Sequence, residues 1–212
     1  SAFNRYRLQD RALHLVLLVP VLLLVQAGFG AYTVLSEISS HVALVHTGIA
    51  TVLVGLLALV VTGTTRPLIE PQKGLNEMRV KRFWWAVVTL AVVAYIVIMS
   101  GAYVTRTGAA LACPEIPLCG VLVGDMAEVQ WNHMGHRGLA VLVGMLMMTV
   151  LGQAWALEHK GILAMAGLMG LLLVVQIGLG IGNVVLGLPA ELRALHLATA
   201  ALFFSVTMYL VG

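Results

Sequence analysis

Long apolar runs separated by short polar connections dominate the pattern of this chain. Six such runs occur, at roughly 13–35, 42–64, 84–104, 134–157, 162–186 and 192–211. A helix needs about 20 apolar residues to cross the hydrocarbon core of a bilayer. The runs are continuous rather than alternating, which excludes the strands of a membrane β-barrel. The pattern predicts an all-α integral membrane protein with six transmembrane helices.

The composition agrees with a chain that lies mostly in lipid. Of its 212 residues, 60% are hydrophobic and 10% are charged, whereas soluble domains carry about 25% charged residues. The first apolar run is too long for a signal peptide and lacks a small-residue cleavage site. We therefore expect the helices themselves to direct insertion into the cell membrane.

The basic residues predict the orientation, because short cytoplasmic loops collect Lys and Arg. Nine cations fall on one side of the predicted helices and three on the other. The nine are Arg5, Arg7, Arg11, Arg66, Lys73, Arg79, Lys81, Arg82 and Lys160, and the three are Arg106, Arg137 and Arg193. Both termini should thus be cytoplasmic. Topology accounts for the net charge of +3, so no nucleic-acid partner is expected.

The two cysteines, Cys113 and Cys119, fall in a loop predicted to face outward, where disulfides persist. Five residues, two of them prolines, separate them, and a bridge across that spacing is sterically feasible. The alternatives are two unpaired thiols or two metal ligands. We favour the disulfide because no histidine stands nearby at the spacing of a zinc site.

An internal repeat relates two helix pairs. "LLLVQAGFGAYTV" at 22–34 aligns with "LLVVQIGLGIGNV" at 172–184 at an offset of 150, which also places His46 on His196. A Gln, two Gly and a His at one offset are not easily accidental. The sequence then divides into a helix pair (1–64), a linker (65–83) and a complete four-helix unit (84–212), and the first pair repeats the back half of that unit.

The chain starts with Ser rather than Met and stops inside an apolar run. Both features fit a partial chain, and we expect a further helix pair to precede the first one. Processing, a tag remnant or a genuine six-helix variant are the alternatives.

Histidines are the main candidates for chemistry inside the membrane. None of the nine carboxylates sits deep in an apolar run, which argues against a transporter built on an intramembrane acid. His46, His136 and His196 each lie a few residues inside the outer end of a predicted helix, so at 1.5 Å per residue they share a similar depth.

His136 and His196 belong to one four-helix unit and can serve as the two axial ligands of a heme iron. The alternative is that each imidazole bonds a backbone carbonyl; two histidines at matched depth favour the heme. Arg137 is a candidate for binding the heme propionates. His133, on the same helix face as His136, either lines the cavity or caps the helix.

The motifs "GAYVTRTGAALACPEIPLC", "HMGHR" and "ALHLATA" resemble those of the heme A synthases, membrane enzymes that oxidise heme O to heme A for cytochrome oxidases. Bacterial members have two four-helix halves, and this chain resembles helices three to eight. The resemblance implies that His136 and His196 hold a heme b. It also implies that His46 belongs to the catalytic half, where heme O is substrate and heme A product.

The family carries an E-x-x-H arrangement in its catalytic half, whereas His133 stands three residues before His136. The resemblance therefore implies oxidation of the C8 methyl of heme O, but with an incomplete catalytic half in this chain. The alternatives are a non-catalytic, b-heme-binding accessory or electron-transfer subunit of a respiratory complex, and a membrane scaffold with structural histidines. Compatible partners are the lipid bilayer, heme-biosynthetic or cytochrome oxidase components, and a second copy of the chain.

Overall fold

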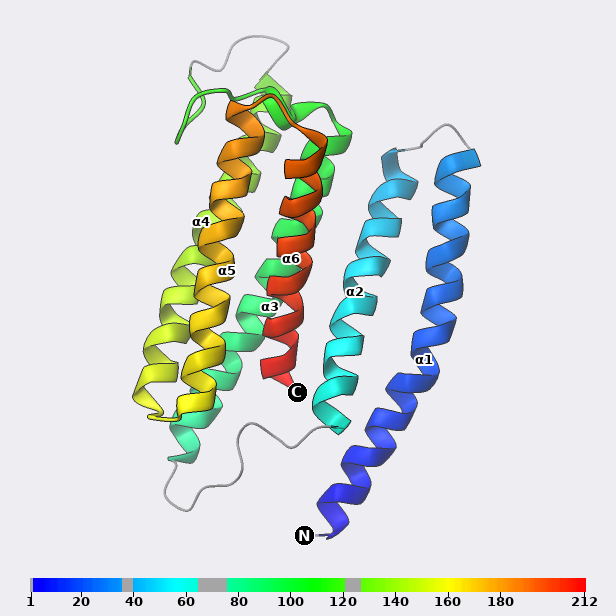
Figure 1. Cartoon of the computed structure of the whole chain (residues 1–212), viewed down its shortest axis with the longest axis vertical. Helices are drawn as coiled ribbons and strands as arrows, with labels where there is room; N and C mark the ends of the chain where they lie inside the picture. Colours follow the sequence, from blue (N-terminus) through cyan, green and yellow to red (C-terminus); the bar gives the residue numbers. More distant parts are fainter. Residues whose placement is uncertain (1, 36–39, 65–75, 121–126) are drawn as a thin grey trace.

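The computed structural model consists of six long helices joined by short connections (Figure 1). It describes residues 2–35, 40–64, 76–120 and 127–212, with side chains for 16–35, 41–63, 76–120 and 127–212. The helices are α1 (Ala2–Leu35), α2 (Ser40–Thr64), α3 (Glu77–Arg106), α4 (Ala127–Ala156), α5 (Lys160–Val185) and α6 (Ala190–Val211), and a short 3-10 helix, η1 (Ala109–Leu111), follows α3. The described residues contain no strand, and six helices are long and apolar enough to cross a membrane. The predicted all-α, multi-pass architecture is confirmed.

Every helix begins before its apolar run does, by two residues in α2, α5 and α6 and by seven or more in α1, α3 and α4. The Asn76 side chain caps α3 by accepting hydrogen bonds from the amides of Met78 and Arg79, so the helix starts at Glu77 rather than at 84. Likewise α4 starts at Ala127 rather than at 134. In α3, helical hydrogen bonding continues past the apolar segment because the cap satisfies amides of the first turn. The end of the predicted linker (65–83) is thus helical, and its residues 65–75 lie outside the described part.

Four of the helices form a ring. α3 packs on α4, α4 on α5, α5 on α6, and α6 closes on α3, which leaves α4 and α6 on one diagonal of the bundle. Phe83, Leu90, Met147, Ile162 and Met169 are fully buried between them. Helices in lipid associate through such close packing because the tails are as apolar as the side chains.

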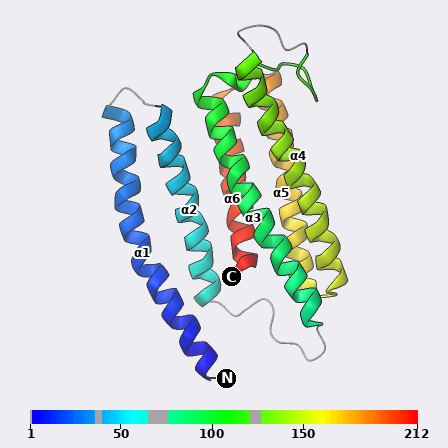
Figure 2. The same cartoon turned by 180° about the vertical axis from the view of Figure 1, so that it is seen from behind.

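The remaining pair, α1 and α2, is attached through α2, which packs on α6 and α3 (Figures 1 and 2). At this contact Gly55 faces Phe204 so closely that a Cβ on Gly55 would lie 2.8 Å from Cε1 of the ring. No residue in the apolar window of α1 is buried. α1 is therefore the outermost helix, and α2 lies between α1 and the four-helix ring.

The chain termini and the loop with the cysteines lie toward opposite ends of the molecule (Figure 1). Both chain termini lie toward the lower end of Figure 1, and the described part of the connection after α3 lies at the upper end. That connection contains η1 and both cysteines. Which end faces the cytoplasm stays a prediction from the basic residues.

Candidate functional site

Each of the three membrane histidines packs against a glycine of the helix that precedes it in the sequence. A Cβ on Gly30 would lie 3.0 Å from Cε1 of His46, and one on Gly180 would lie 3.2 Å from Cε1 of His196. A Cβ on Gly101 would approach Cε1 of His136 to 2.9 Å. These glycines let the imidazoles lie directly against a backbone, which fixes the depth and tilt of the rings.

Gln26 contacts both ring nitrogens of His46, one through its backbone oxygen and the other through its side-chain amide. Nδ1 of His46 lies 3.1 Å from the backbone oxygen of Gln26, and Nε2 lies 3.3 Å from the side-chain nitrogen of the same residue. A carbonyl oxygen only accepts, so Nδ1 carries the proton. Nε2 then has the lone pair, which accepts a hydrogen bond from the amide and is the form of imidazole that binds iron.

The repeat reproduces this contact at His196. The side-chain nitrogen of Gln176 lies 3.2 Å from Nε2 of His196. Nδ1 of His196 is buried and has no hydrogen bond of good geometry. The ring is half-buried near the start of α6, with a lone pair on Nε2 held only by an amide.

His136 is held by a serine of α3. Ser100 Oγ donates to the backbone oxygen of Val97 at 2.8 Å and lies 2.9 Å from Nδ1 of His136. Because the single hydroxyl proton is used on Val97, Oγ accepts from Nδ1, and the lone pair of His136 is again on Nε2. A partner on Nδ1 is the usual second contact of a metal-binding histidine.

His136 and His196 stand on the diagonal helices α4 and α6, toward the end of the bundle that carries the cysteine loop. Among the described residues, no group of three or more His, Cys, Asp or Glu is placed to hold a bare metal ion. Two imidazoles whose Nε2 atoms have no backbone partner, although Nε2 of His196 accepts from the Gln176 amide, instead suit a metal that already has its other ligands, as in heme. The residues present fit that group.

Cys113 and Cys119 are joined by a disulfide in the loop above this pair. Arg137 ties the loop to α4, because its guanidinium donates to the backbone oxygens of Glu115 (2.7 Å), Pro117 (3.1 Å) and Cys113 (2.6 Å). The structure thus places Arg137, proposed from sequence as a propionate ligand, on the carbonyls of the loop. The loop is anchored one residue from His136.

The other sequence candidates separate into two places. His133 is buried under the loop and interacts with the backbone of Ala109 in η1. His46 pairs with α1. The structure brings His136 and His196 into one bundle and gives His46 a separate environment.

Sequence reasoning missed the residues that orient the rings. Gln26 and Gln176 were visible in the repeat, and each precedes its histidine by 20 residues, which was an available signal. Ser100 lies 36 residues before His136 in a helix that has no repeat-related copy in this chain, so no pattern marked it.

Comparison with known proteins identifies the family of the chain. The model of the cytochrome oxidase assembly protein family, COX15-CtaA, matches residues 1–208. The heme A synthase of Bacillus pumilus (strain SAFR-032) is 35% identical over 135 residues, which are 61% of this chain and 43% of that protein. The heme A synthase of Halalkalibacterium halodurans is 28% identical over 204 residues, which are 93% of this chain and 66% of that protein.

A protein of Roseiflexus castenholzii named protoheme IX farnesyltransferase is 28% identical over 185 residues, which are 86% of this chain and 33% of that protein. In each case the chain spans less than two thirds of the relative's own length. The family match covers nearly all of the chain, including all three histidines and both cysteines. The protein therefore belongs to the COX15-CtaA family of cytochrome oxidase assembly proteins.

Proposed function

We propose that this chain acts in heme A synthesis, in the oxidation of the C8 methyl of heme O to the formyl group of heme A. The relatives named heme A synthase support the reaction class. The observation that carries the proposal is the pair His136 and His196, on diagonal helices and with both Nε2 lone pairs free of backbone partners.

His136 and His196 would hold a heme b through Nε2, which supplies one-electron transfer when bound. Ser100 would keep His136 in the required tautomer. Converting a methyl to a formyl group with an oxygen from water releases four electrons and four protons. The electrons need an acceptor outside this chain, and a bis-histidine site suits their stepwise passage.

His46 is proposed as a residue of the substrate-heme site. Its ring has the same Gln and Gly partners as His196, which supports a second heme-facing histidine. His133 occupies the place where the catalytic half of the family carries a carboxylate. The α3–α6 bundle is thus assigned to electron transfer, and the chemistry to the half that contains α1 and α2.

The chain is proposed to lie in the cell membrane, with both termini in the cytoplasm and the disulfide loop outside. The relative named protoheme IX farnesyltransferase contains a segment similar to this chain. That match supports association with heme-biosynthetic enzymes.

The test is spectroscopic. The chain is purified from a host that makes heme B and heme O, and a reduced-minus-oxidised spectrum with a low-spin b-type signal is expected. His136→Ala and His196→Ala should each abolish the signal, whereas His41→Ala, an exposed histidine near the start of α2, should retain it.

Extraction of the bound hemes then distinguishes a heme A synthase from a non-catalytic electron-transfer subunit. Heme A in the extract supports the synthase. A b-type signal without heme A, even when a helix pair with the family's E-x-x-H arrangement is co-expressed, favours the non-catalytic electron-transfer subunit. A wild-type protein that binds no heme contradicts both proposals.

A further inference from the structure

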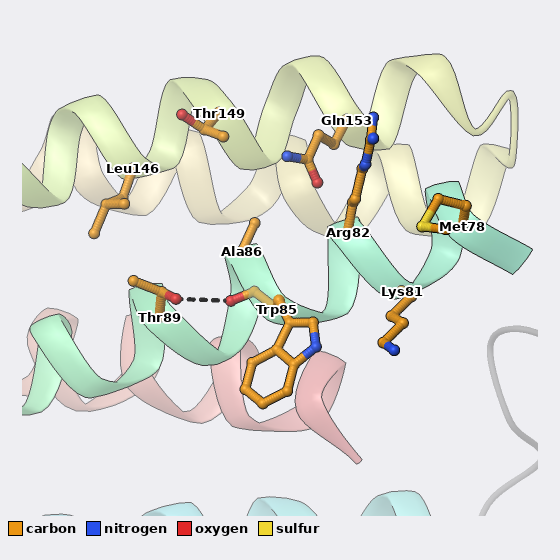
Figure 3. Close-up of a pocket in the computed structure, with 9 residues that line it drawn as sticks. All are labelled: Met78, Lys81, Arg82, Trp85, Ala86, Thr89, Leu146, Thr149 and Gln153. Carbon is orange, nitrogen blue, oxygen red and sulfur yellow. Dashed lines mark hydrogen bonds between the residues drawn. The ribbon is translucent and has the colours of Figure 1, made fainter.

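A groove of about 440 Å³ lies between α3 and α4 at the end of the bundle opposite the cysteine loop (Figure 3). Its lining is mostly apolar, with Ala86, Leu146 and the ring of Trp85 among the walls. Two cations, Lys81 and Arg82, stand at its charged end. The groove thus changes from charged to apolar along its length, as the interface of a bilayer does.

Within the described part of the chain, Lys81 and Arg82 are exposed and form no ion pair. The neighbouring Arg79 differs, because its guanidinium donates to the backbone oxygen of Ala156 at 3.2 Å. Figure 3 shows Arg82 extending from α3 toward α4, beside Gln153. The charge of Arg82 is therefore available to a ligand in the groove.

Gln153, on α4, indicates a second chemical group that a ligand of the groove would carry. Its side-chain oxygen is buried and has no hydrogen-bond partner, and the residue belongs to the groove lining. A buried acceptor without a donor is costly. A ligand that brings a hydroxyl group next to its anionic group would satisfy this oxygen and both cations together.

We propose that this groove binds one molecule of an anionic glycerophospholipid with a hydroxyl-bearing headgroup, of which phosphatidylglycerol is the simplest. The phosphate lies by Lys81 and Arg82, a headgroup hydroxyl donates to Gln153, and an acyl chain follows Ala86 and Leu146. Basic pockets between membrane helices bind lipid headgroups in this way. A soluble phosphate would leave the apolar wall unused. The inference does not depend on heme.

The experiment measures phosphatidylglycerol bound per full-length chain in detergent by native mass spectrometry, with phosphatidylcholine as the neutral reference. Arg82→Gln should lower the affinity by about fivefold, and Lys81→Gln should act in the same direction. Lys160→Gln is the matched control, because Lys160 is an exposed cation at the same end and lies outside the groove. It should retain the lipid.

A second variant tests the hydroxyl. Gln153→Met should reduce the affinity for phosphatidylglycerol and should leave the binding of phosphatidic acid, which lacks the headgroup hydroxyls, unchanged. Equal loss in Lys160→Gln would show a general charge effect and overturn the site. Inorganic phosphate that binds as tightly as the lipid, or retention by Arg82→Gln, would also overturn it.

Discussion

The side-chain nitrogen of Gln176 lies 3.2 Å from Nε2 of His196, and the repeat-related Gln26 meets His46 in the same way at 3.3 Å. The amide therefore contacts the ring nitrogen that would bind iron in both copies of the repeat. The contact belongs to the repeated unit rather than to one helix pair. Heme binding at His196 must displace it.

Replacing Gln176 by Leu should consequently favour heme. The hydrogen bond that competes for Nε2 is lost, and because such bonds contribute about 1 kcal/mol, the affinity for heme b should rise by roughly fivefold. Titration of the heme-free chain with hemin measures it. Gln26→Leu, which alters the equivalent contact at His46, should leave b-type binding unchanged. A weaker affinity in Gln176→Leu would instead mean that the amide positions the ring.

Ser100→Ala should weaken heme binding through His136. The variant removes the acceptor that holds the proton on Nδ1, and loss of such a second contact costs about tenfold or more in metal affinity. The same titration and the b-type difference spectrum report it. Ser205→Ala is the control, because Ser205 bonds within its own helix to Ala201. Equal effects of the two substitutions would refute the role of Ser100.

Gly101→Ala should disturb His136 by contact alone. The added Cβ would lie 2.9 Å from Cε1 of the ring, and overpacking of this kind costs about 1–3 kcal/mol. Gly138→Ala, where a Cβ meets nothing within 4 Å, should be neutral or stabilising by less than about 1 kcal/mol. Denaturation in mixed detergent, with and without heme, compares them. Equal stability of the two variants would contradict the packing argument.

Arg137→Gln should loosen the disulfide loop. Three hydrogen bonds from one charged group to loop carbonyls disappear, and bonds to charged groups contribute about 1.5–3 kcal/mol each in general. The disulfide should react faster with dithiothreitol, as measured by thiol labelling of Cys113 and Cys119. Arg193→Gln, an exposed arginine at the start of α6, should react at the wild-type rate. An unchanged rate in Arg137→Gln would show that other contacts hold the loop.

Trp84→Phe should destabilise the ring of helices more than Trp85→Phe. Trp84 Nε1 donates to the backbone oxygen of Val211 at 2.9 Å and so joins the start of α3 to the end of α6. Loss of one such bond costs about 1 kcal/mol. Detergent denaturation followed by circular dichroism gives the difference. If Trp85→Phe is equally destabilising, the edge-on contact of the Trp84 and Trp85 rings, whose centroids lie 4.8 Å apart, is responsible rather than the hydrogen bond.

The helices could be predicted because a transmembrane helix corresponds to one continuous run of apolar residues in the sequence. Each apolar run had to be helical once it lay in lipid, and the offset of 150 that aligned His46 with His196 needed no structure. The full length of α3 did not follow from its apolar run, because the Asn76 cap acts through backbone geometry outside the apolar segment.

The contacts of the site could not be predicted to the same depth. The path of the loop decides what Arg137 reaches, and its guanidinium turns to three carbonyls of that loop. Ser100 and Gly101 meet His136 only because α3 and α4 cross at one particular height. The relative axial position of two helices follows from how their whole surfaces pack. No local pattern in a single sequence gives that position.

Gly55 and Phe204, which meet where α2 packs on α6, limit how alike the two repeated helices can be. At the offset of 150, Gly55 corresponds to Ser205 and Phe204 to Val54, so the two copies differ at their mutual contact. One copy has glycine where the other has serine, and valine where the other has phenylalanine. A side chain at 55 needs space that the phenylalanine at 204 occupies. The two copies of the repeat therefore pack on each other through residues that they do not share.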